Sequence, residues 1–235
     1  MHVLPNFALA SACSENRQWM RKGVHSALTW KLQSIAIKIL IAAADMRLGL
    51  FGGSFDPVHA GHLLVAQAAM EEMQLDRLCF IPAAQSPFKP GSSPAAPAER
   101  LRLLRLALAG RNKYSIDEQE ITRGGPSYTI ETVREYRQRF TGAKLFYLIG
   151  ADHIPLLPKW REAAELASLV EFVVIPRPGE PPGTLAPPFR QHLLRGFPLG
   201  VSSSQIRERI KAGLPVEGLV PGAVAEAISN NRLYL

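Results

Sequence analysis

The stretch that most constrains the fold of this chain is a strand, a glycine turn and a helix start in direct succession. Arg47 to Phe51 is typical of a buried strand, Gly52-Gly53 breaks it, and an apolar pattern typical of a helix runs from Ala60 to Met73. The first N–H groups of a helix lack intrahelical partners, and the helix dipole favours negative charge there. The stretch therefore predicts an anion site, and we expect the two glycines, which carry no Cβ, to let a bulky ligand approach the backbone.

Two histidines stand at the predicted helix start. His59 and His62 are three residues apart, which places them on one helix face. Two imidazoles there suit phosphate oxygens; the simplest alternative is a pair of polar capping histidines, and a shared zinc ion is another. The sequence offers no obvious third zinc ligand nearby and holds only two cysteines, Cys13 and Cys79. We therefore favour a phosphate site.

The rest of the chain alternates between strand and helix patterns. Strands are predicted at 47–51, 77–83, 114–117, 145–150 and 170–175, and helices at 60–73, 98–108, 127–140, 162–167, 203–212 and 221–230. Such alternation implies a parallel sheet that is covered on both faces. We predict an α/β fold, with a doubly wound (Rossmann-like) parallel sheet flanked by helices in a single domain over residues 46–235.

Residues 1–45 differ in composition from the rest. They hold two of the three tryptophans, and Ile35 to Ala44 is apolar except for Lys38. A signal peptide is conceivable, because Ala42-Ala43-Ala44 resembles a cleavage site. However, the apolar run lies late, is interrupted and is too short to span a bilayer. We expect 1–45 to be an extension, either poorly ordered or upstream of a true start at Met46.

A chain that starts at Met46 is predicted to fold and to keep full activity, because the first strand begins directly after this residue. The measurement is a comparison of solubility and turnover between the full chain and residues 46–235. Loss of either on truncation would show that the extension packs on the domain.

The charge and the cysteine count limit the class of ligand and compartment. The net charge is +7, of which +3 lies in residues 1–45 (five Lys/Arg against two Asp/Glu) and +4 in the remainder (22 against 18). The basic residues are scattered, which favours small phosphorylated ligands over a nucleic-acid track or a membrane surface. Two distant cysteines argue against a disulfide framework and favour a reducing, cytoplasmic compartment.

The run from Gly52 to Leu63 resembles a known signature. Its residues, Gly-Gly-Ser-Phe-Asp-Pro-Val-His-Ala-Gly-His-Leu, are similar to the motif of bacterial nicotinate mononucleotide adenylyltransferases, members of the nucleotidyltransferase superfamily. The short His-x-Gly-His occurs also in pantetheine-phosphate adenylyltransferases and cytidylyltransferases, whereas the longer run is more specific. The resemblance extends from Met46 to the C-terminus. It implies adenylyl transfer from ATP to nicotinate mononucleotide, giving nicotinate adenine dinucleotide and pyrophosphate in NAD biosynthesis.

A second signature stands near the C-terminus. Val201-Ser-Ser-Ser-Gln-Ile-Arg207 is similar to the family's Ile-Ser-Ser-Thr-x-Ile-Arg, with mild substitutions at Val201 and Ser204. Hydroxyls and N–H groups at a helix start, with an arginine in the first turn, can grip a triphosphate. The alternative is a capped helix with a surface arginine. The resemblance implies His59, His62 and Arg207 as catalytic residues and an ATP site that comprises Gly52, Gly53, Ser54, Phe55, His59, His62, Gly150, Asp152, Ser203, Ser204 and Arg207.

Gly150 and Asp152 enter this set from the apolar strand over 145–149. In an open parallel sheet, ligands bind at the carboxyl ends of strands where the strand order switches. If this strand neighbours the first one, both ends face one crevice and Asp152 can accept hydrogen bonds from ribose hydroxyls. The alternative is a helix-capping aspartate.

The acceptor site is expected from three further stretches. The family places a tryptophan at the position of Trp160 to stack on the pyridine ring, and it uses Ser127, Tyr128 and Thr129 for the nicotinate carboxylate. The alternatives are a core tryptophan and simple N-capping by Ser127. Lys89 is expected as a phosphate contact, and this chain departs from the family in having Phe88 where a histidine is common.

The implied chemistry needs no general base, because a phosphate monoester is largely ionised at neutral pH. Mg²⁺ is expected with ATP, bound mostly by water, and we name no protein ligand for it. ATP and nicotinate mononucleotide are the expected partners, without nucleic acid or membrane; the sequence does not reveal the oligomeric state. The alternatives are an adenylyltransferase acting on phosphopantetheine or on nicotinamide mononucleotide, or a basic nucleic-acid-binding protein that has lost catalysis.

Overall fold

A six-stranded parallel sheet forms the centre of the computed structural model, which describes residues 46–87, 94–177, 179, 183–197 and 199–235. The strand order is β3-β2-β1-β4-β5-β6, and every neighbouring pair is parallel. This is the doubly wound order, so the predicted fold class is confirmed. The strands are β1 (Arg47–Gly53), β2 (Arg77–Pro82), β3 (Tyr114–Ile116), β4 (Lys144–Gly150), β5 (Glu171–Ile175) and β6 (Gln191–Leu193).

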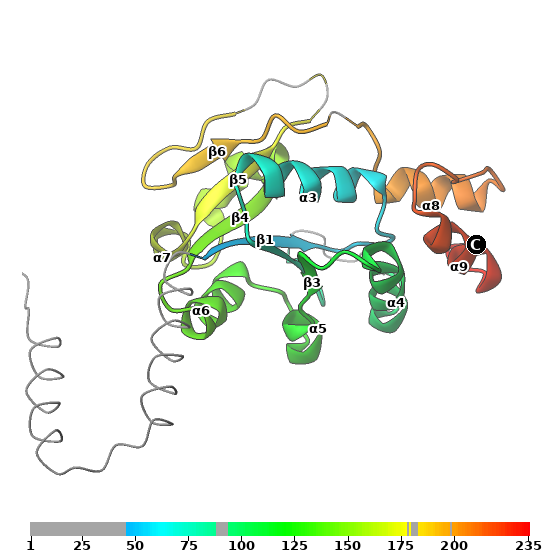
Figure 1. Ribbon diagram of the computed structural model, residues 1–235, viewed down its shortest axis with the longest axis horizontal. Helices are drawn as coiled ribbons and strands as arrows, with labels where there is room; N and C mark the ends of the chain where they lie inside the picture. The colour runs from blue at the N-terminus through cyan, green and yellow to red at the C-terminus, as the bar shows by residue number, and fades with distance from the viewer. Residues whose placement is uncertain (1–45, 88–93, 178, 180–182, 198) are drawn as a thin grey trace, which may run out of the picture. The chain divides into compact units, whose positions relative to one another are not determined.

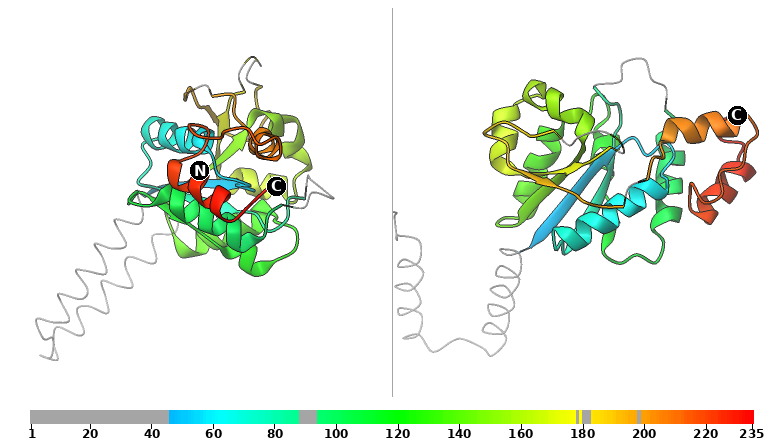
Figure 2. Two further views of the ribbon diagram at one scale, coloured as in Figure 1. Left: turned by 90° about the vertical axis from the view of Figure 1, so that its right-hand side faces the viewer. Right: turned by 90° about the horizontal axis from the view of Figure 1, so that it is seen from above.

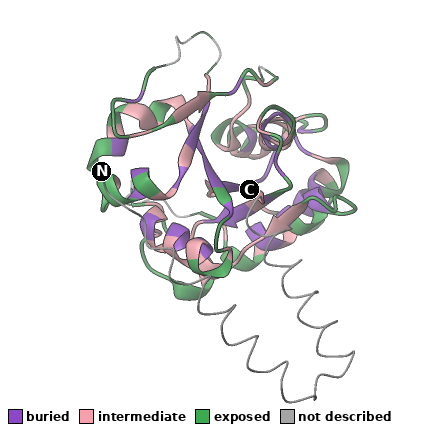
Figure 3. Cartoon of the chain, turned by 60° about the vertical axis from the view of Figure 1, so that its left-hand side comes forward, coloured by how far each residue is buried: buried purple, intermediate pink, exposed green. Residues whose placement is uncertain are grey.

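Helices cover both faces of the sheet (Figures 1 and 2). They are α3 (Ala60–Glu72), α4 (Pro97–Leu108), α5 (Gln119–Arg123), α6 (Thr129–Arg139), the 3₁₀ helix η2 (Ala151–Lys159), α7 (Ala163–Leu169), α8 (Ser203–Lys211) and α9 (Gly222–Asn230). One hydrophobic core joins α3, α4 and α9 to one face, and a second joins α6 and α7 to the other. The side chains of a strand alternate between the two cores, as Leu50 and Phe51 do. Figure 3 shows how far the strands are buried.

The structure adds three elements that the sequence patterns did not predict. β6 has three residues, none of them buried, and therefore lacks the apolar run of the central strands. α5 has five residues, too few for a recognisable helical period. η2 contains Pro155 and Pro158, which remove backbone donors and disguise the helical pattern. The helix predicted over 127–140 begins at Thr129 and ends at Arg139.

The fold brings the ends of β1 and β4 together. These two strands are neighbours, with Phe51 opposite Leu148 in the register. On the other side of β1 lies β2, so the chain winds outward in opposite directions from the β1/β4 pair. A crevice at the carboxyl ends of strands is expected at this switch point. Within the described ranges, no helix is long and apolar enough to cross a membrane.

Candidate active site

Two adjoining cavities open at the carboxyl ends of β1 and β4. The larger has a volume of about 780 Å³ and the smaller about 200 Å³. Every residue expected to bind ATP lines the larger cavity. The lining shared by both cavities comprises Phe51, Gly52, Gly53, Ser54, Gly150 and His153. A ligand in each cavity would therefore meet the other at the glycine turn.

The two histidines lie in contact at the start of α3. Their ring centroids are 3.7 Å apart and the rings are tilted by 30°. The His59 backbone N–H donates to Nδ1 of His62 at 3.2 Å. Because Nδ1 of His62 accepts this bond, a neutral His62 ring carries its proton on Nε2 and can donate from that atom.

The surroundings keep both rings neutral. His59 is only 6% exposed, and burial, followed by the positive charge of Arg177, lowers its pKa to about 4. The pKa of His62 is also lowered well below its usual value, by burial first and then by His59 and Arg177. Burial disfavours the charged imidazolium, and a nearby cation adds to this. The site is therefore two neutral imidazoles beside a positive field, which suits a ligand that brings negative charge.

Acid should destabilise the protein through His59. The pKa of His59 is about 4 in the folded protein, below its usual value of 6.5. Between these two pH values, His59 is therefore protonated in the unfolded chain but neutral in the folded protein. The contribution of His59 to stability is present above pH 6.5 and is lost as the pH falls from 6.5 toward 4. Its expected size is on the order of 3 kcal/mol.

The measurement for this prediction is urea unfolding at pH 7 and pH 4.5. His59→Gln should lose less unfolding free energy between the two pH values than the unmodified protein does. If His59→Gln and the unmodified protein lose the same unfolding free energy between these pH values, the prediction that His59 stays neutral in the folded protein is wrong.

The structure adds a second physical reason for the two glycines of the turn. A Cβ on Gly52 would lie 2.4 Å from the Tyr147 hydroxyl, and a Cβ on Gly53 would lie 3.1 Å from the Phe55 ring. The space that a side chain would need is thus filled by the protein itself. Phe55 is buried and has a φ of +47°, inside the left-handed region. Packing of the turn therefore also requires glycine at both positions, and both glycines line the two cavities, where they were expected to let a ligand approach the backbone.

The second signature closes the larger cavity at the start of α8. Ser202 caps this helix, accepting a hydrogen bond from the Gln205 backbone N–H. The Ser203 hydroxyl donates to the Pro57 carbonyl at 2.9 Å, which ties α8 to the glycine turn. Arg207 donates to the Asp56 carbonyl at 2.8 Å, and its other terminal nitrogen lies 3.4 Å from the Ser204 hydroxyl. The arginine is thus held at the cavity wall, where its planar donor fork can meet phosphate oxygens.

Arg177 is a cation of this cavity that the sequence reasoning missed. It follows β5 and donates to the Asp152 carboxylate at 3.2 Å, with both side chains half exposed. The proline- and glycine-rich composition after it indicated a loop and hid its role in the site. Its position just past the end of a third strand, together with the rule for parallel sheets, is the signal that could have found it.

The smaller cavity gathers the residues expected around the acceptor. Ser127, Thr129 and Trp160 line it, together with Glu120 and Tyr147, which the sequence reasoning did not single out. The Thr129 hydroxyl donates to the Tyr147 hydroxyl at 3.3 Å. Tyr147 packs edge-on against Trp160, with a centroid distance of 6.3 Å. Glu120 is buried, which raises its pKa, and accepts a hydrogen bond from Thr132 at 2.6 Å.

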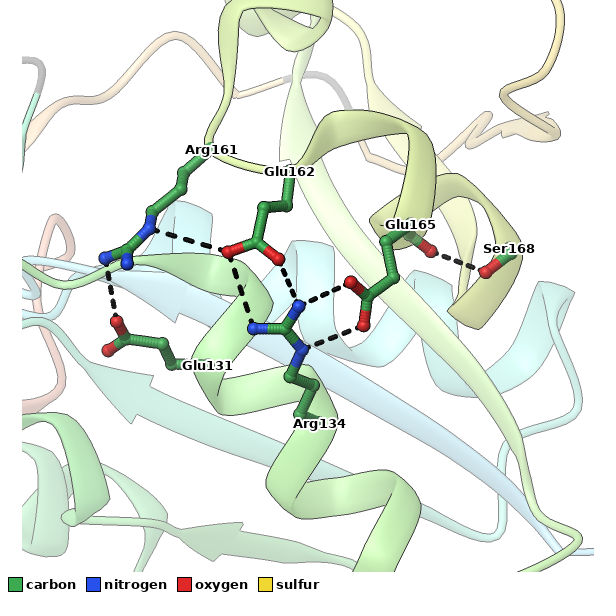
Figure 4. A network of polar contacts seen from close by, with 6 residues as sticks. All are labelled: Glu131, Arg134, Arg161, Glu162, Glu165 and Ser168. Carbon is green, nitrogen blue, oxygen red and sulfur yellow. Dashed lines mark hydrogen bonds and ion pairs between the residues drawn. The ribbon is translucent and has the colours of Figure 1, made fainter.

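Tyr128 lies outside the lining of this cavity and belongs to its surroundings. Its ring lies under the Arg161 guanidinium, 4.7 Å from the centroid. Arg161 also contacts Glu131 at 3.0 Å. It is part of a network between α6 and the start of α7 that Figure 4 shows, with the charged members Glu131, Arg134, Arg161, Glu162 and Glu165. Exposed ion pairs are individually weak, but these share partners and join α6 to the residues that follow Trp160.

Three further expectations from the sequence concern the loop around Lys89, the position of His153 and a zinc ion at the histidine pair. Lys89 and Phe88 lie outside the described residues. His153, expected on the surface without a role, is half-buried, lines both cavities and packs edge-on against Trp160. Among the described residues, no group of three or more His, Cys, Asp or Glu side chains could hold a metal ion, so the histidine pair has no partner set there for zinc.

Comparisons with known proteins identify relatives over this same region. The sequence family described as cytidylyltransferase-like matches residues 50–209. A probable nicotinate-nucleotide adenylyltransferase from Opitutus terrae is 40% identical over 191 residues, covering 80% of this chain and 98% of the relative. A probable nicotinate-nucleotide adenylyltransferase from Thermus thermophilus is 41% identical over 194 residues, covering 80% of this chain and 100% of the relative.

Solved structures share the fold. The nicotinic acid mononucleotide adenylyltransferase of Plasmodium falciparum, in complex with NaAD, superposes with a TM-score of 0.65 at 14% identity, covering 80% of this chain and 97% of that one. The same enzyme complexed with APC gives a TM-score of 0.66 at 15% identity, with the same coverage. At this low sequence identity, the solved structures show only that the fold is shared. Membership of the family is shown by the sequence relatives, which are about 40% identical.

Proposed function

The chain belongs to the cytidylyltransferase-like superfamily and, within it, to the nicotinate-nucleotide adenylyltransferases, and on that premise we propose that it transfers the adenylyl group of ATP to nicotinate mononucleotide. The products are nicotinate adenine dinucleotide and pyrophosphate, a step of NAD biosynthesis. The enzyme works in the cytoplasm, and residues 46–235 form its catalytic domain.

The observation that carries this proposal is the pair of adjoining cavities. The larger holds the histidine pair and the cations Arg177 and Arg207, which suits a nucleoside triphosphate. The smaller offers the Trp160 ring and the start of α6, which suits a flat heterocycle with a small polar substituent. Their shared wall at the glycine turn is where the two substrates would meet.

The reaction is an in-line displacement at phosphorus. An oxygen of the acceptor's phosphate forms a bond to the α-phosphorus of ATP, and the bond from that phosphorus to the bridging oxygen breaks. The electron pair leaves with pyrophosphate. Because the acceptor phosphate is already ionised, positioning and charge stabilisation supply the catalysis.

The described residues can divide this work between the two ends of the triphosphate. His62 donates from Nε2 to the α-phosphate and His59 lies beside it. Arg207 and Ser204 hold the leaving pyrophosphate, and Arg177 adds a further cation. The negative charge of bound ATP would raise the pKa of both histidines toward pH 7. Their rings would then donate more strongly to phosphate oxygens as negative charge develops during the reaction.

Mg²⁺ enters as part of the Mg-ATP substrate. The site residues fit this form, since the one carboxylate assigned to the ATP site, Asp152, is paired with Arg177. Water and phosphate oxygens are the ligands that Mg²⁺ ordinarily keeps in such complexes. The protein's own part is to hold the phosphates and exclude water.

The test is pyrophosphate release from Mg-ATP with each of three acceptors: nicotinate mononucleotide, nicotinamide mononucleotide and phosphopantetheine. Turnover with nicotinate mononucleotide is expected to be fastest. Turnover only with phosphopantetheine, or with none of them, would contradict the proposal.

A further inference from the structure

A buried carboxylate that has no role in the proposed mechanism lies in the turn between β1 and α3. Asp56 is 5% exposed. Its Oδ1 accepts two hydrogen bonds, from the Tyr234 hydroxyl at 2.8 Å and from the Ala95 backbone N–H at 3.2 Å. A buried carboxylate is costly unless it is paired and hydrogen-bonded, so these two partners fix its position.

Asp56 in turn holds the arginine of the second signature. Nη1 of Arg207 donates to the Asp56 backbone carbonyl at 2.8 Å and lies 3.8 Å from Oδ2 of the same residue. One guanidinium nitrogen is therefore committed to Asp56 by a hydrogen bond and a charge contact. The orientation of the remaining donors toward the cavity depends on where Asp56 sits.

A second buried charged side chain contacts the same turn. Arg100 is 1% exposed; its Nη1 donates to the Ser54 carbonyl at 2.8 Å and its Nε to the Ala95 carbonyl at 3.0 Å. Burial lowers the pKa of Arg100, and the charge of Asp56 opposes that effect. The two opposite charges thus fasten the glycine turn to the start of α4.

Tyr234 reaches this junction from the last turn of the chain, 178 residues away in sequence. Its ring packs against the core of α3, α4 and α9, and the chain end lies beside α9 (Figure 1). Burial, followed by the charge of Asp56, raises the pKa of the Tyr234 phenol. The hydroxyl therefore keeps its proton and is the donor in the bond to Asp56.

We propose that Tyr234 is a positioning residue of the ATP site, acting through Asp56 on Arg207. The end of the chain, rather than only α8, then sets the direction in which the Arg207 guanidinium meets the pyrophosphate portion of ATP. This inference rests on the proposed ATP site.

The test is a double-mutant cycle on ATP binding. The dissociation constant of Mg-ATP is measured by titration calorimetry for the unmodified protein, Tyr234→Phe, Arg207→Ala and the double variant. Tyr234→Phe keeps the ring and removes only the donor, so it preserves packing. A single lost hydrogen bond predicts a dissociation constant about three- to tenfold higher in Tyr234→Phe, and no further rise when the same change is made in Arg207→Ala.

The matched control is Tyr114→Phe, which removes a half-buried phenol hydroxyl in β3, outside both main cavities, and should leave ATP binding unchanged. The inference is overturned if Tyr234→Phe binds ATP like the unmodified protein, or if it weakens binding by the same factor with and without Arg207. Pyrophosphate release by the unmodified protein separates this inference from the proposed function. If the unmodified protein releases pyrophosphate and either of those two results is found, only the role of Tyr234 is wrong. If the unmodified protein does not bind ATP, the proposed ATP site and the role of Tyr234 are both wrong.

Discussion

Replacing His62 by alanine is expected to lower kcat about 10²- to 10³-fold while the protein stays folded. His62 is fixed by the hydrogen bond from the His59 backbone to its Nδ1 and by contacts with the Phe51 and Phe55 rings. In the proposed mechanism, its Nε2 is therefore a preorganised donor at the point where charge develops on the α-phosphate. Such a donor stabilises the transition state more than bound ATP, so the loss should appear in kcat rather than in the KM for ATP.

The comparison needs a control for the removal of an imidazole. His192→Ala serves this purpose, because His192 lies in β6, is partly exposed and pairs with Glu171 outside both cavities. Turnover of this variant should stay close to normal. Thermal unfolding of both variants shows whether either has lost its fold. Near-normal turnover of folded His62→Ala would remove the assignment of this residue to the phosphate site.

The fold and the larger cavity followed from local sequence patterns because their physical causes are local. A buried parallel strand is an apolar run, and a phosphate-binding turn is glycines followed by a helix start, as in Gly52 to His62. Gly150 and Asp152 could be placed at the same crevice only on the condition that β1 and β4 are neighbours, which the structure shows. Short elements such as β6 and α5 escaped because three to five residues do not complete a recognisable period.

Residues whose place depends on tertiary contacts could not be found in this way. Tyr147 reads as one more apolar residue of a buried strand, yet its hydroxyl fills the space beside Gly52 and meets Thr129. Asp56 looked like an ordinary turn residue before proline, yet it binds Tyr234 from the far end of the chain. Only the packed structure shows that these groups surround the site, because their partners are distant in sequence.

Nicotinate mononucleotide is expected to be preferred over nicotinamide mononucleotide by about ten- to a hundredfold in kcat/KM, which corresponds to about 1–3 kcal/mol. The two acceptors differ in one group, a carboxylate against a neutral amide. α6 begins at Thr129, in the wall of the smaller cavity, and the first N–H groups of a helix have no intrahelical partners. A carboxylate accepts from such donors, whereas the amide NH₂ would meet them and leave polar groups unpaired.

The smaller cavity also contains a carboxylate, Glu120, whose charge would oppose the preference for nicotinate. Glu120 lines it, and an ionised carboxylate there would repel nicotinate and attract the amide. Burial raises the pKa of Glu120, and one of its carboxylate oxygens is already engaged by a hydrogen bond from Thr132. Glu120→Gln keeps an acceptor oxygen for Thr132 and removes any residual charge. This variant should therefore keep or increase the preference for nicotinate.

The measurement is kcat/KM for each acceptor at saturating Mg-ATP, for the unmodified protein and for Glu120→Gln. Trp160 can stack on either pyridine ring, so it contributes affinity without discrimination, and Trp160→Ala should weaken both acceptors by a similar factor. Equal values for the two acceptors in the unmodified protein would refute a donor-lined pocket at the start of α6. A preference for the amide that disappears in Glu120→Gln would show instead that the buried carboxylate, and not the helix start, faces the substituent of the pyridine ring.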